Sequence, residues 1–395
     1  MAAKKKQKQM KETILILGAD GYIGWSAMLY FGVRNNGRVV GVDNYSKRKQ
    51  MKEIKSESLI PIESMNTRIK SYEKMFNKNN LDFHEFDITD AKLLGKLLKT
   101  LKPTVIFNFA QMPSAPYSML DLDHAVWTTK NNVIGNLNLL WLMKEHCPNA
   151  HLIKMGTMGE YGTPNIDIPE GFFEIDYNGR KDNLPFPKQA GSFYHWAKVF
   201  ETQHTNFASK IWGLRATDLM QGVVYGVTTE ESKMSNEVSN SFYYDGIFGT
   251  AINRFVSQAI CGSPITPFGK GKQTRGFLNI KDSMQCFELY VMNPPKKGEY
   301  RVFNQLVEQH RTVNTLAKMV KRIAKKKGYN ATIKNIKNPR LESEDHYYNA
   351  ITSKLEGLGL KPCNFEEEIE RMFDDLEPYK DKFDKKTLTP KVKWK

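Results

Sequence analysis

The chain has 395 residues, of which 40% are hydrophobic and 26% are charged, and its formal net charge is +15. This length and composition are typical of a globular protein with one large domain or two ordinary ones. No apolar run approaches the roughly 20 residues that a membrane-spanning helix needs, so no membrane partner is expected.

The termini and the cysteines limit the location and the partners that the protein can be expected to have. The lysine-rich tail at 1–12 lacks the apolar segment of a secretory signal, so we expect a cytoplasmic protein. The four cysteines are widely scattered and form no C-x-x-C pair, which argues against a zinc site or a disulfide framework. Much of the basic excess lies in 1–12 and in a C-terminal tail at 376–395. Such tails are usually solvated, so no nucleic-acid partner is expected, although a basic surface would suit an anionic substrate.

A dinucleotide-binding pattern stands near the N-terminus. An apolar run at 13–17 predicts a buried parallel strand, a glycine-rich turn follows it, and a helical pattern then runs to about Arg34. In this context Gly18 permits a tight turn, Gly21 lets the backbone approach a pyrophosphate, and Gly24 lets the helix pack closely. The segment therefore predicts a dinucleotide site.

The next strand, at 39–42, delivers Asp43 at its carboxyl end. A carboxylate there would accept hydrogen bonds from the adenosine ribose and repel a 2′-phosphate, which favours NAD over NADP. Lys47, Arg48 and Lys49 follow closely and leave NADP as an alternative.

The following elements alternate in the same way. After a charged insertion at 46–80 with a helical middle at 62–76, the patterns predict strands at 81–86, 105–110, 152–155 and 211–216, and helices at 131–146 and 192–210, with a linker at 164–191. This order predicts an α/β fold, a Rossmann-type doubly wound parallel sheet over 13–226. The alternation weakens afterwards, so we expect 227–375 to form a second, smaller mixed α/β substrate lobe with segments that return to the first domain.

One apolar stripe in the helix at 131–146 is interpreted as core. It consists of Val133, Leu137, Leu140 and Trp141.

The segment Ser192 to Lys198 contains a Y-x-x-x-K motif. Residues four apart share one face of a helix, so Tyr194 and Lys198 can present a phenol and an ammonium to one pocket. A nearby ammonium stabilises a phenolate and would lower the tyrosine pKa, which makes Tyr194 a candidate general base. Thr157 follows the strand at 152–155, at the sheet edge where open parallel sheets bind ligands. Together these features indicate a nicotinamide-dependent dehydrogenase-type site.

The cofactor-binding candidates follow the strands and the two motifs. Asp87 and Ile88 would contact adenine, and Phe109 and Ala110 would lie beside the cofactor. The full set is Gly18, Asp20, Gly21, Tyr22, Ile23, Gly24, Asp43, Asn44, Asp87, Ile88, Phe109, Ala110, Asn132, Tyr194 and Lys198.

The motifs resemble those of the extended short-chain dehydrogenase/reductases, the nucleotide-sugar epimerases and dehydratases. Longer blocks, at 114–119, 131–135, 156–167, 215–226, 269–280 and 338–349, resemble the UDP-sulfoquinovose synthases within that group. The resemblance covers residues 13 to 375 and includes the insertion after Asp43. Plant-type members have Glu-Gln-Arg where Gln111-Met112-Pro113 stands here, so a substrate-contacting arginine is either missing or supplied elsewhere.

The resemblance implies NAD as cofactor, UDP-glucose and sulfite as substrates, and UDP-6-sulfo-6-deoxyglucose as product. Tyr194 would take the proton of the glucose 4-hydroxyl while the C4 hydride passes to NAD, Thr157 would align the same oxygen, and Lys198 would hold the nicotinamide ribose. The 4-ketone would lose water to give a 5,6-ene, and sulfite would add to it before the hydride returns. The cycle needs no metal. The family also pairs two helices per subunit, so a homodimer is expected.

The acid and base of the elimination depart from the dehydratase pattern. Dehydratases carry an Asp-Glu pair after the aligned Thr, whereas Met158-Gly159 stands here. His195 is the first candidate for this proton transfer and Glu160 the second. A buried structural histidine and a satisfied structural carboxylate are the alternatives.

Substrate contacts are also implied by the resemblance. Arg275 and Arg340 match positions that hold nucleotide phosphates or ribose, since guanidinium groups bind phosphates in a bidentate manner. Gln221 and Asn253 are further candidates for phosphate or uracil contacts, and Met158 would lie beside the sugar.

Two other functions stay open. A UDP-glucose 4-epimerase, or another NAD-dependent nucleotide-sugar epimerase, would share Thr157, Tyr194 and Lys198, although the blocks at 114–119 and 338–349 argue against it. An NAD-binding regulatory or RNA-associated protein would use the basic surface instead, and the intact Thr/Tyr/Lys set argues against that.

Overall fold

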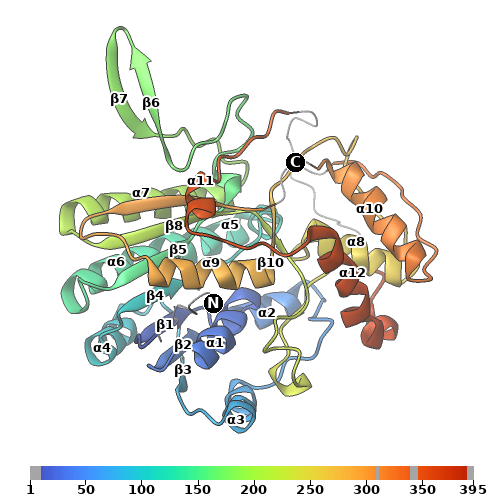
Figure 1. Cartoon of the computed structure of the whole chain (residues 1–395), viewed down its shortest axis with the longest axis horizontal. Coiled ribbons are helices and arrows are strands. Elements are labelled where there is room, and N and C mark those ends of the chain that lie inside the picture. The colour runs from blue at the N-terminus through green and yellow to red at the C-terminus, as the bar shows by residue number, and fades with distance from the viewer. Residues whose placement is uncertain (1–9, 308–310, 339–345, 389–395) are drawn as a thin grey trace, which may run out of the picture.

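The structure, a computed structural model, describes residues 10–307, 311–338 and 346–388. Its centre is a seven-stranded parallel sheet with the strand order β11-β8-β5-β4-β1-β2-β3 (Figure 1). The strands are β1 (Ile14–Leu17), β2 (Val39–Asp43), β3 (Leu81–Glu85), β4 (Val105–Asn108), β5 (His151–Met155), β8 (Arg215–Gln221) and β11 (Tyr300–Gln305). The predicted doubly wound parallel sheet is confirmed.

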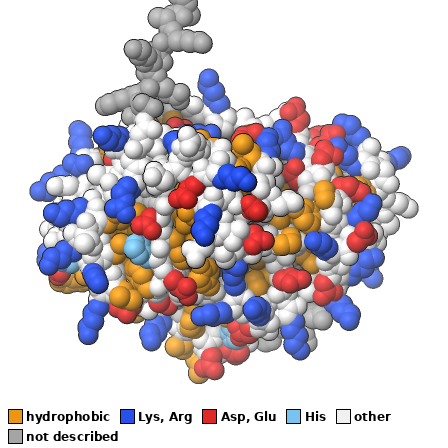
Figure 2. All heavy atoms as spheres, turned by 90° about the horizontal axis from the view of Figure 1, so that it is seen from below, with side chains coloured by type: hydrophobic (Ala, Val, Ile, Leu, Met, Phe, Trp, Pro, Cys, Tyr) orange, Lys and Arg blue, Asp and Glu red, His pale blue; other side chains and the backbone are white. Residues whose placement is uncertain are grey.

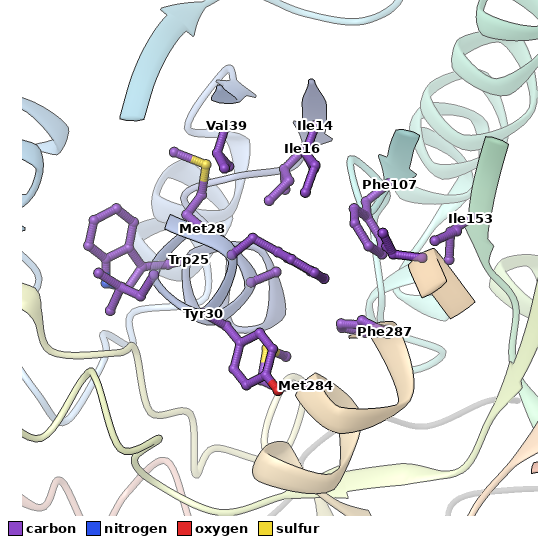
Figure 3. Packing of buried hydrophobic residues seen from close by; sticks show 14 of the residues in the cluster. Ile14, Ile16, Trp25, Met28, Tyr30, Val39, Phe107, Ile153, Met284 and Phe287 are labelled. Atoms are coloured by element: carbon purple, nitrogen blue, oxygen red, sulfur yellow. The ribbon is translucent and has the colours of Figure 1, made fainter. Parts of the chain in front are cut away.

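Helices cover both faces of this sheet, because the central strands are apolar on both sides. Ile14 and Ile16 of β1 pack with residues of α1 (Tyr22–Arg34) and α9 (Ile280–Met292), as Figure 3 shows. Leu15 and Leu17 point to the opposite face, where they pack against α4 (Ala91–Leu101), α6 (Gly135–His146) and α7 (Phe193–Trp212). The carboxyl ends of the strands are thereby held rigidly at one edge of the sheet.

The insertion at 46–80 contains two helices, α2 (Ser46–Glu53) and α3 (Met65–Phe76). Ser64 caps α3 by accepting a hydrogen bond from the backbone N–H of Thr67. The helix therefore begins at Met65, three residues later than the pattern at 62–76 predicts.

Two predicted segments differ from the structure. The strand expected at 211–216 starts later, because α7 continues to Trp212 and Gly213, with a φ of 70°, ends it. The linker at 164–191 contains an antiparallel hairpin, β6 (Phe172–Tyr177) and β7 (Arg180–Pro185). Its turn is Asn178-Gly179, a dipeptide that favours positive φ, and the hairpin projects from the body of the molecule (Figure 1).

The apolar stripe predicted for the helix at 131–146 is wrong in part. Leu140 is buried, but Trp141 is 46% exposed, and Val133 and Leu137 are only half-buried. The helix begins with a π-helical segment, η2 (Lys130–Ile134), after α5 (Leu122–Thr129), and this changes the helical phase of the side chains.

Residues beyond β8 build a separate hydrophobic core. Strand β9 (Val223–Tyr225) pairs in parallel with β10 (Phe277–Asn279), and α8 (Ala251–Ile260), α10 (Val313–Lys326) and α12 (Phe365–Leu376) pack beside them. The chain returns through β11 to the edge of the main sheet. The assignment of 227–375 to a substrate lobe stays a prediction. Short elements complete the fold: η1 (Tyr117–Met119), η3 (Met158–Glu160), η4 (Asn236–Val238), α11 (Ser353–Gly357) and η5 (Glu377–Lys382).

The surface carries charges of both signs. Figure 2 shows one face on which Lys and Arg side chains are interspersed with Asp and Glu side chains around smaller hydrophobic areas. Among the described helices none is both long and apolar enough to cross a membrane. In the same residues, no cluster of three or more His, Cys, Asp or Glu side chains is arranged to hold a metal ion.

Candidate active site

One cavity of about 610 Å³ lies at the carboxyl edge of the sheet and extends under the segments 243–255 and 268–277. It brings together most of the residues that the sequence predicts for cofactor, catalysis and substrate. These are Gly18, Gly21, Tyr22, Ile23, Gly24, Asp43, Asn44, Asp87, Ile88, Phe109, Ala110, Thr157, Met158, Tyr194, His195, Lys198, Gln221 and Arg275.

Other candidates do not line this cavity. The Asp20 carboxylate is buried and bound by Arg48 at 2.7 Å and Arg68 at 3.0 Å. Asn132 holds the backbone N–H and carbonyl of Met112, and its neighbour Asn131 reaches the cavity instead. The side chain of Asn253 accepts a hydrogen bond from the backbone N–H of Gly226 at 3.4 Å. Arg340 lies outside the described residues.

The glycine-rich turn has the shape that a dinucleotide diphosphate requires. Gly18 has a φ of 86°, and a Cβ there would lie 2.5 Å from the carbonyl carbon of Phe109. A Cβ at Gly24 would lie 1.9 Å from the carbonyl oxygen of Gly18. Gly21 is the N-cap of α1 and supplies no side-chain cap, so the first-turn N–H groups of the helix can meet an anion. These residues fit the diphosphate of NAD.

Asp43 is held firmly at the end of β2. One of its carboxylate oxygens accepts from the backbone N–H of Asp20 at 2.9 Å, and the other accepts from that of Tyr45 at 2.7 Å. Burial and the neighbouring charge of Asp20 raise its pKa to about 6. Each oxygen keeps a lone pair, so the carboxylate fits a ribose diol.

The three basic residues after Asp43 differ in their surroundings. Arg48 is bound to Asp20, and Lys49 is exposed. Lys47 lines the cavity with its ammonium 2.9 Å from the centroid of the Phe248 ring. Only Lys47 is therefore placed to contact a cofactor.

Tyr194 and Lys198 lie one turn apart on α7, which Ser192 caps by accepting from the backbone N–H of His195 at 3.2 Å. The Lys198 ammonium is 2% exposed and donates to the Met155 carbonyl at 2.6 Å. Burial lowers the pKa of Lys198 to about 8, against the opposing charge of Glu201. The motif thus presents both groups to the cavity, as predicted.

The predicted lowering of the Tyr194 pKa is wrong for the protein alone. Burial raises this pKa well above its ordinary value, and the charges of Glu201 and Glu160 add to the rise. A hydrogen bond with the Thr157 side chain acts in the opposite direction. Desolvation of the phenolate and the two carboxylate charges therefore outweigh this hydrogen bond.

His195 lies beside the tyrosine, with its ring centroid 4.9 Å from that of Tyr194. Its Nδ1 is 2.9 Å from Ser192 Oγ, and its Nε2 is 2.3 Å from the position that a Cβ at Gly159 would occupy. The glycine therefore makes room for the imidazole, at the place where dehydratases carry a carboxylate. The histidine lines the cavity and is positioned for contact with a ligand.

Glu160 is completely buried and turned away from the cavity. It forms ion pairs with Lys188 at 3.2 Å and Lys154 at 4.0 Å, and it accepts from the backbone N–H of Thr157 at 3.2 Å. Burial favours its neutral form, but the charges of Lys188 and Lys154 outweigh this effect and lower its pKa. The geometry favours the satisfied structural carboxylate over the acid–base role.

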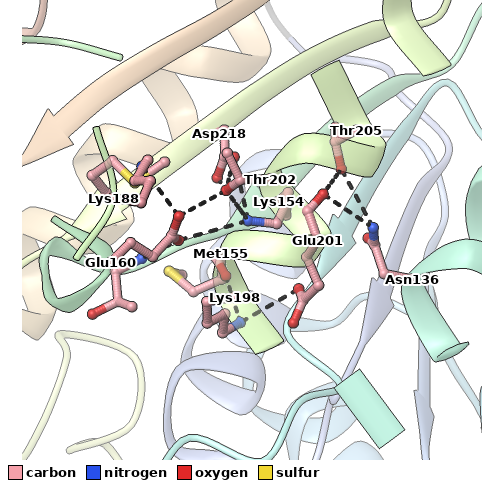
Figure 4. Close-up of polar contacts among 12 residues, drawn as sticks. Asn136, Lys154, Met155, Glu160, Lys188, Lys198, Glu201, Thr202, Thr205 and Asp218 are labelled. Carbon is pink, nitrogen blue, oxygen red and sulfur yellow. Dashed lines mark hydrogen bonds and ion pairs between the residues drawn. The ribbon is translucent and has the colours of Figure 1, made fainter. Parts of the chain in front are cut away.

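A buried network of polar side chains packs against the catalytic candidates (Figure 4). Lys154 lies 3.1 Å from Asp218, and the Thr202 hydroxyl lies within hydrogen-bond distance of two carboxylates, at 2.7 Å from Asp218 and 3.0 Å from Glu160. Tyr300 donates to Asp218 at 2.7 Å. Sequence reasoning missed this network, since its members come from separate strands and helices and form no local motif.

The segment 111–113 also lines the cavity. Two arginines also line the cavity. Arg275 donates to the Thr274 carbonyl at 2.8 Å. Arg254, which the sequence analysis did not select, donates to the Thr266 carbonyl at 3.1 Å. Both guanidinium groups come from segments beyond β8.

Comparisons with known proteins show the family and the fold to which the chain is similar. The profile of the NAD dependent epimerase/dehydratase family matches residues 14–304. The chain is 47% identical to the chloroplastic UDP-sulfoquinovose synthase of Spinacia oleracea, over 98% of this chain and 80% of that protein. It is 41% identical to the UDP-sulfoquinovose synthase of Sulfolobus acidocaldarius, over 97% of each. In fold it is similar to the UDP-glucuronic acid 4-epimerase of Bacillus cereus, solved with UDP-glucuronic acid and NAD, with a TM-score of 0.67, 20% identity and coverage of 92% of this chain and 99% of that one.

Proposed function

The chain belongs to the NAD dependent epimerase/dehydratase family and, within it, to the UDP-sulfoquinovose synthases, and from this membership we propose that it joins sulfite to UDP-glucose. The chain is therefore an enzyme of the UDP-sulfoquinovose synthase type. The proposed product is UDP-6-sulfo-6-deoxyglucose, and water is released. The observation that carries the proposal is the meeting of Thr157, Tyr194, Lys198 and His195 in one cavity beside the glycine-rich turn.

NAD, when bound, accepts the hydride from C4 of glucose and later returns it. Tyr194 would remove the proton of the 4-hydroxyl, and Thr157, already hydrogen-bonded to the tyrosine, would hold the same sugar oxygen. The Lys198 ammonium would bind the nicotinamide ribose and stabilise the phenolate. Asp43 would hold the adenosine ribose, and the N-terminus of α1 would hold the diphosphate.

His195 would carry the protons of the elimination and addition. The 4-ketone acidifies the C5 proton, so the imidazole can remove it while the C6 hydroxyl leaves as water. The sulfur lone pair of sulfite then forms the C6–S bond, the electrons of the 5,6-ene move toward the ketone, and C5 regains a proton. The absence of a side chain at Gly159, which admits the imidazole, supports this assignment.

Arg254 and Arg275 are the proposed anchors of the UDP diphosphate, since both residues line the cavity. Gln221 and Met158 would lie beside the nucleotide and the sugar.

The test uses UDP-glucose with and without sulfite, followed by mass spectrometry. We expect a UDP-sugar with a 6-sulfonate only when sulfite is present, and little net product without it. UDP-galactose in both incubations would instead indicate an epimerase.

A homodimer is also proposed. The continuous helix formed by α5, η2 and α6 packs against α7. The outer faces of these two helices expose large apolar side chains: Leu122, Val126, Trp141, Phe193, Trp196, Phe200, Phe207 and Ile211. A two-fold pairing of these faces would bury them in a four-helix bundle. Light scattering after size exclusion should give the mass of a dimer, and Phe207→Glu should give a monomer.

We further propose that the protein acts in the cytoplasm, although the spinach relative is chloroplastic. A fluorescent fusion expressed in the source cells tests this location.

A further inference from the structure

Glu201 and Lys198 form a buried ion pair on α7, the helix that also carries the proposed general base Tyr194. The two residues are three apart on α7, the ammonium lies 3.7 Å from Glu201 Oε2, and their side chains are 2% and 0% exposed (Figure 4). The Lys198 ammonium also donates to the carbonyl of Met155. Glu201 is therefore the counterion of this lysine.

The other side of Glu201 is nearly empty of polar partners. Gln111 donates its amide to Oε2, whereas Oε1 has no hydrogen-bond partner among the described residues. The Gln111 amide is neutral, so it adds no second negative charge beside the Glu201 carboxylate.

The surrounding charges already have partners of their own. Lys154 of β5 pairs with Asp218 of β8, and Lys188 pairs with Glu160 of η3. His195 and Thr157 are the other polar groups that face Tyr194. Removal of Glu201 would take away the carboxylate that pairs with the Lys198 ammonium. An unpaired charge in a buried site raises the free energy of the folded protein.

We propose that Glu201 is a positioning residue that keeps Lys198 in its charged form, so that the ammonium stays available to Tyr194 and to the cofactor. This inference rests on the proposed use of Tyr194 and Lys198 in turnover. It assigns to the carboxylate a role that acts through the lysine and requires no contact with the sugar.

The titration of the pair agrees with this geometry. Burial lowers the pKa of Lys198 to about 8, although the negative charge of Glu201 acts to raise it. Burial raises the pKa of Glu201 to about 7, and the Lys198 charge works against that rise. Without the carboxylate, burial would act on Lys198 with less opposition, and the lysine would lose its proton at lower pH.

The test is the pH dependence of the first half-reaction. Holoenzyme is mixed with UDP-glucose in the absence of sulfite, and reduction of bound NAD is followed at 340 nm in a single turnover. For Glu201→Gln we expect the upper pH limb to move down by about one unit or more, since an opposite charge at this distance shifts a pKa by about 1 to 3 units. Below about pH 6 the profiles should coincide, because the Glu201 carboxyl of the wild type is then largely protonated and the amide of the variant is neutral at every pH.

Two variants complete the experiment. Glu201→Asp keeps the charge and should return the upper limb toward the wild type, whereas Glu145→Gln, on the exposed end of α6, is the matched control. An unchanged upper limb in Glu201→Gln, with NAD content and thermal unfolding as in the wild type, would overturn the inference. So would a faster reaction of Glu201→Gln above about pH 7, where the wild-type carboxylate is charged, since it would mean that Glu201 only opposes the phenolate. If the wild type itself does not reduce NAD with UDP-glucose, the proposed function fails instead.

Discussion

The His195 imidazole occupies the space in front of Gly159, with Nε2 2.3 Å from where a Cβ would stand. Any side chain at 159 must displace this ring, because real Cβ atoms do not approach heavy atoms so closely. The glycine and the histidine therefore form one structural unit.

The variant Gly159→Ala should lose activity while the protein stays folded. We expect a fall in kcat of about 10-fold or more, since a shifted imidazole no longer meets C5 of the sugar. Steady-state turnover of UDP-glucose and sulfite measures the effect. Gly357→Ala is the control, because a Cβ at Gly357 meets nothing within 4 Å. Equal losses in both variants would argue against a special role for the glycine.

Tyr194→Phe removes the phenol with little change of shape. The variant should retain NAD yet lose turnover by a factor of about 10² to 10⁴, since the base that accepts the 4-hydroxyl proton is gone. Product formation is measured by mass spectrometry and bound nucleotide by absorbance. Near-normal turnover would move the base to another residue, with His195 next to be examined.

Purified protein should carry NAD, because redox-neutral turnover favours a cofactor that stays bound and Asp43 faces the expected ribose site. Denaturation followed by chromatography identifies the released nucleotide. Recovery of NADP alone would contradict the argument from Asp43 and would point to Lys47, whose ammonium lines the same cavity.

The buried His151 should make the free energy of unfolding depend on pH. Burial, with the charges of Arg301 and Arg215, lowers its pKa to about 3. Between about pH 6.5 and 3 the unfolded chain binds a proton that the folded chain does not, so His151 reduces stability as the pH falls, by about 1.4 kcal/mol per pH unit. Asp43 and Glu201, whose pKa values are raised, act in the opposite direction over part of this range.

The comparison of wild type with His151→Gln isolates this contribution. The amide can still reach Thr217 Oγ1, which lies 2.8 Å from His151 Nε2. Urea unfolding at several pH values should show that the free energy of unfolding of the variant rises relative to that of the wild type as the pH falls below about 6.5. A difference that does not change with pH would contradict the assignment, and His84→Gln reports the same substitution at the surface.

The sequence predicted the sheet because each central strand is a short apolar run followed by a turn signal, as at Leu17-Gly18. It also predicted the local parts of the site, since the glycine-rich turn and the Tyr194-Lys198 spacing each lie within one element. The buried network was missed because Lys154, Glu160 and Asp218 meet only through tertiary packing. No residue near any one of them indicates its partner.

Two errors had local causes. Asn178-Gly179 is a strong hairpin signal, but the polar residues around it are equally typical of a linker, which is what the sequence analysis predicts there. The phase of the apolar stripe that includes Trp141 was misjudged, because the π-helical segment before α6 rotates the later side chains. The role of Arg340, which lies outside the described residues, stays a prediction.

The hairpin β6–β7 should be the first place where a protease cuts the folded protein. Arg180 and Lys181 follow its turn, both are exposed, and a two-stranded ribbon without a third strand opens easily. Trypsin would then nick the chain between about 180 and 182, while both new ends stay anchored by Gly171 packing on Val302 and by Lys188 bound to Glu160. A nicked enzyme of this kind would hold its two fragments together without a covalent link, with Tyr194 and the glycine-rich turn on different polypeptides.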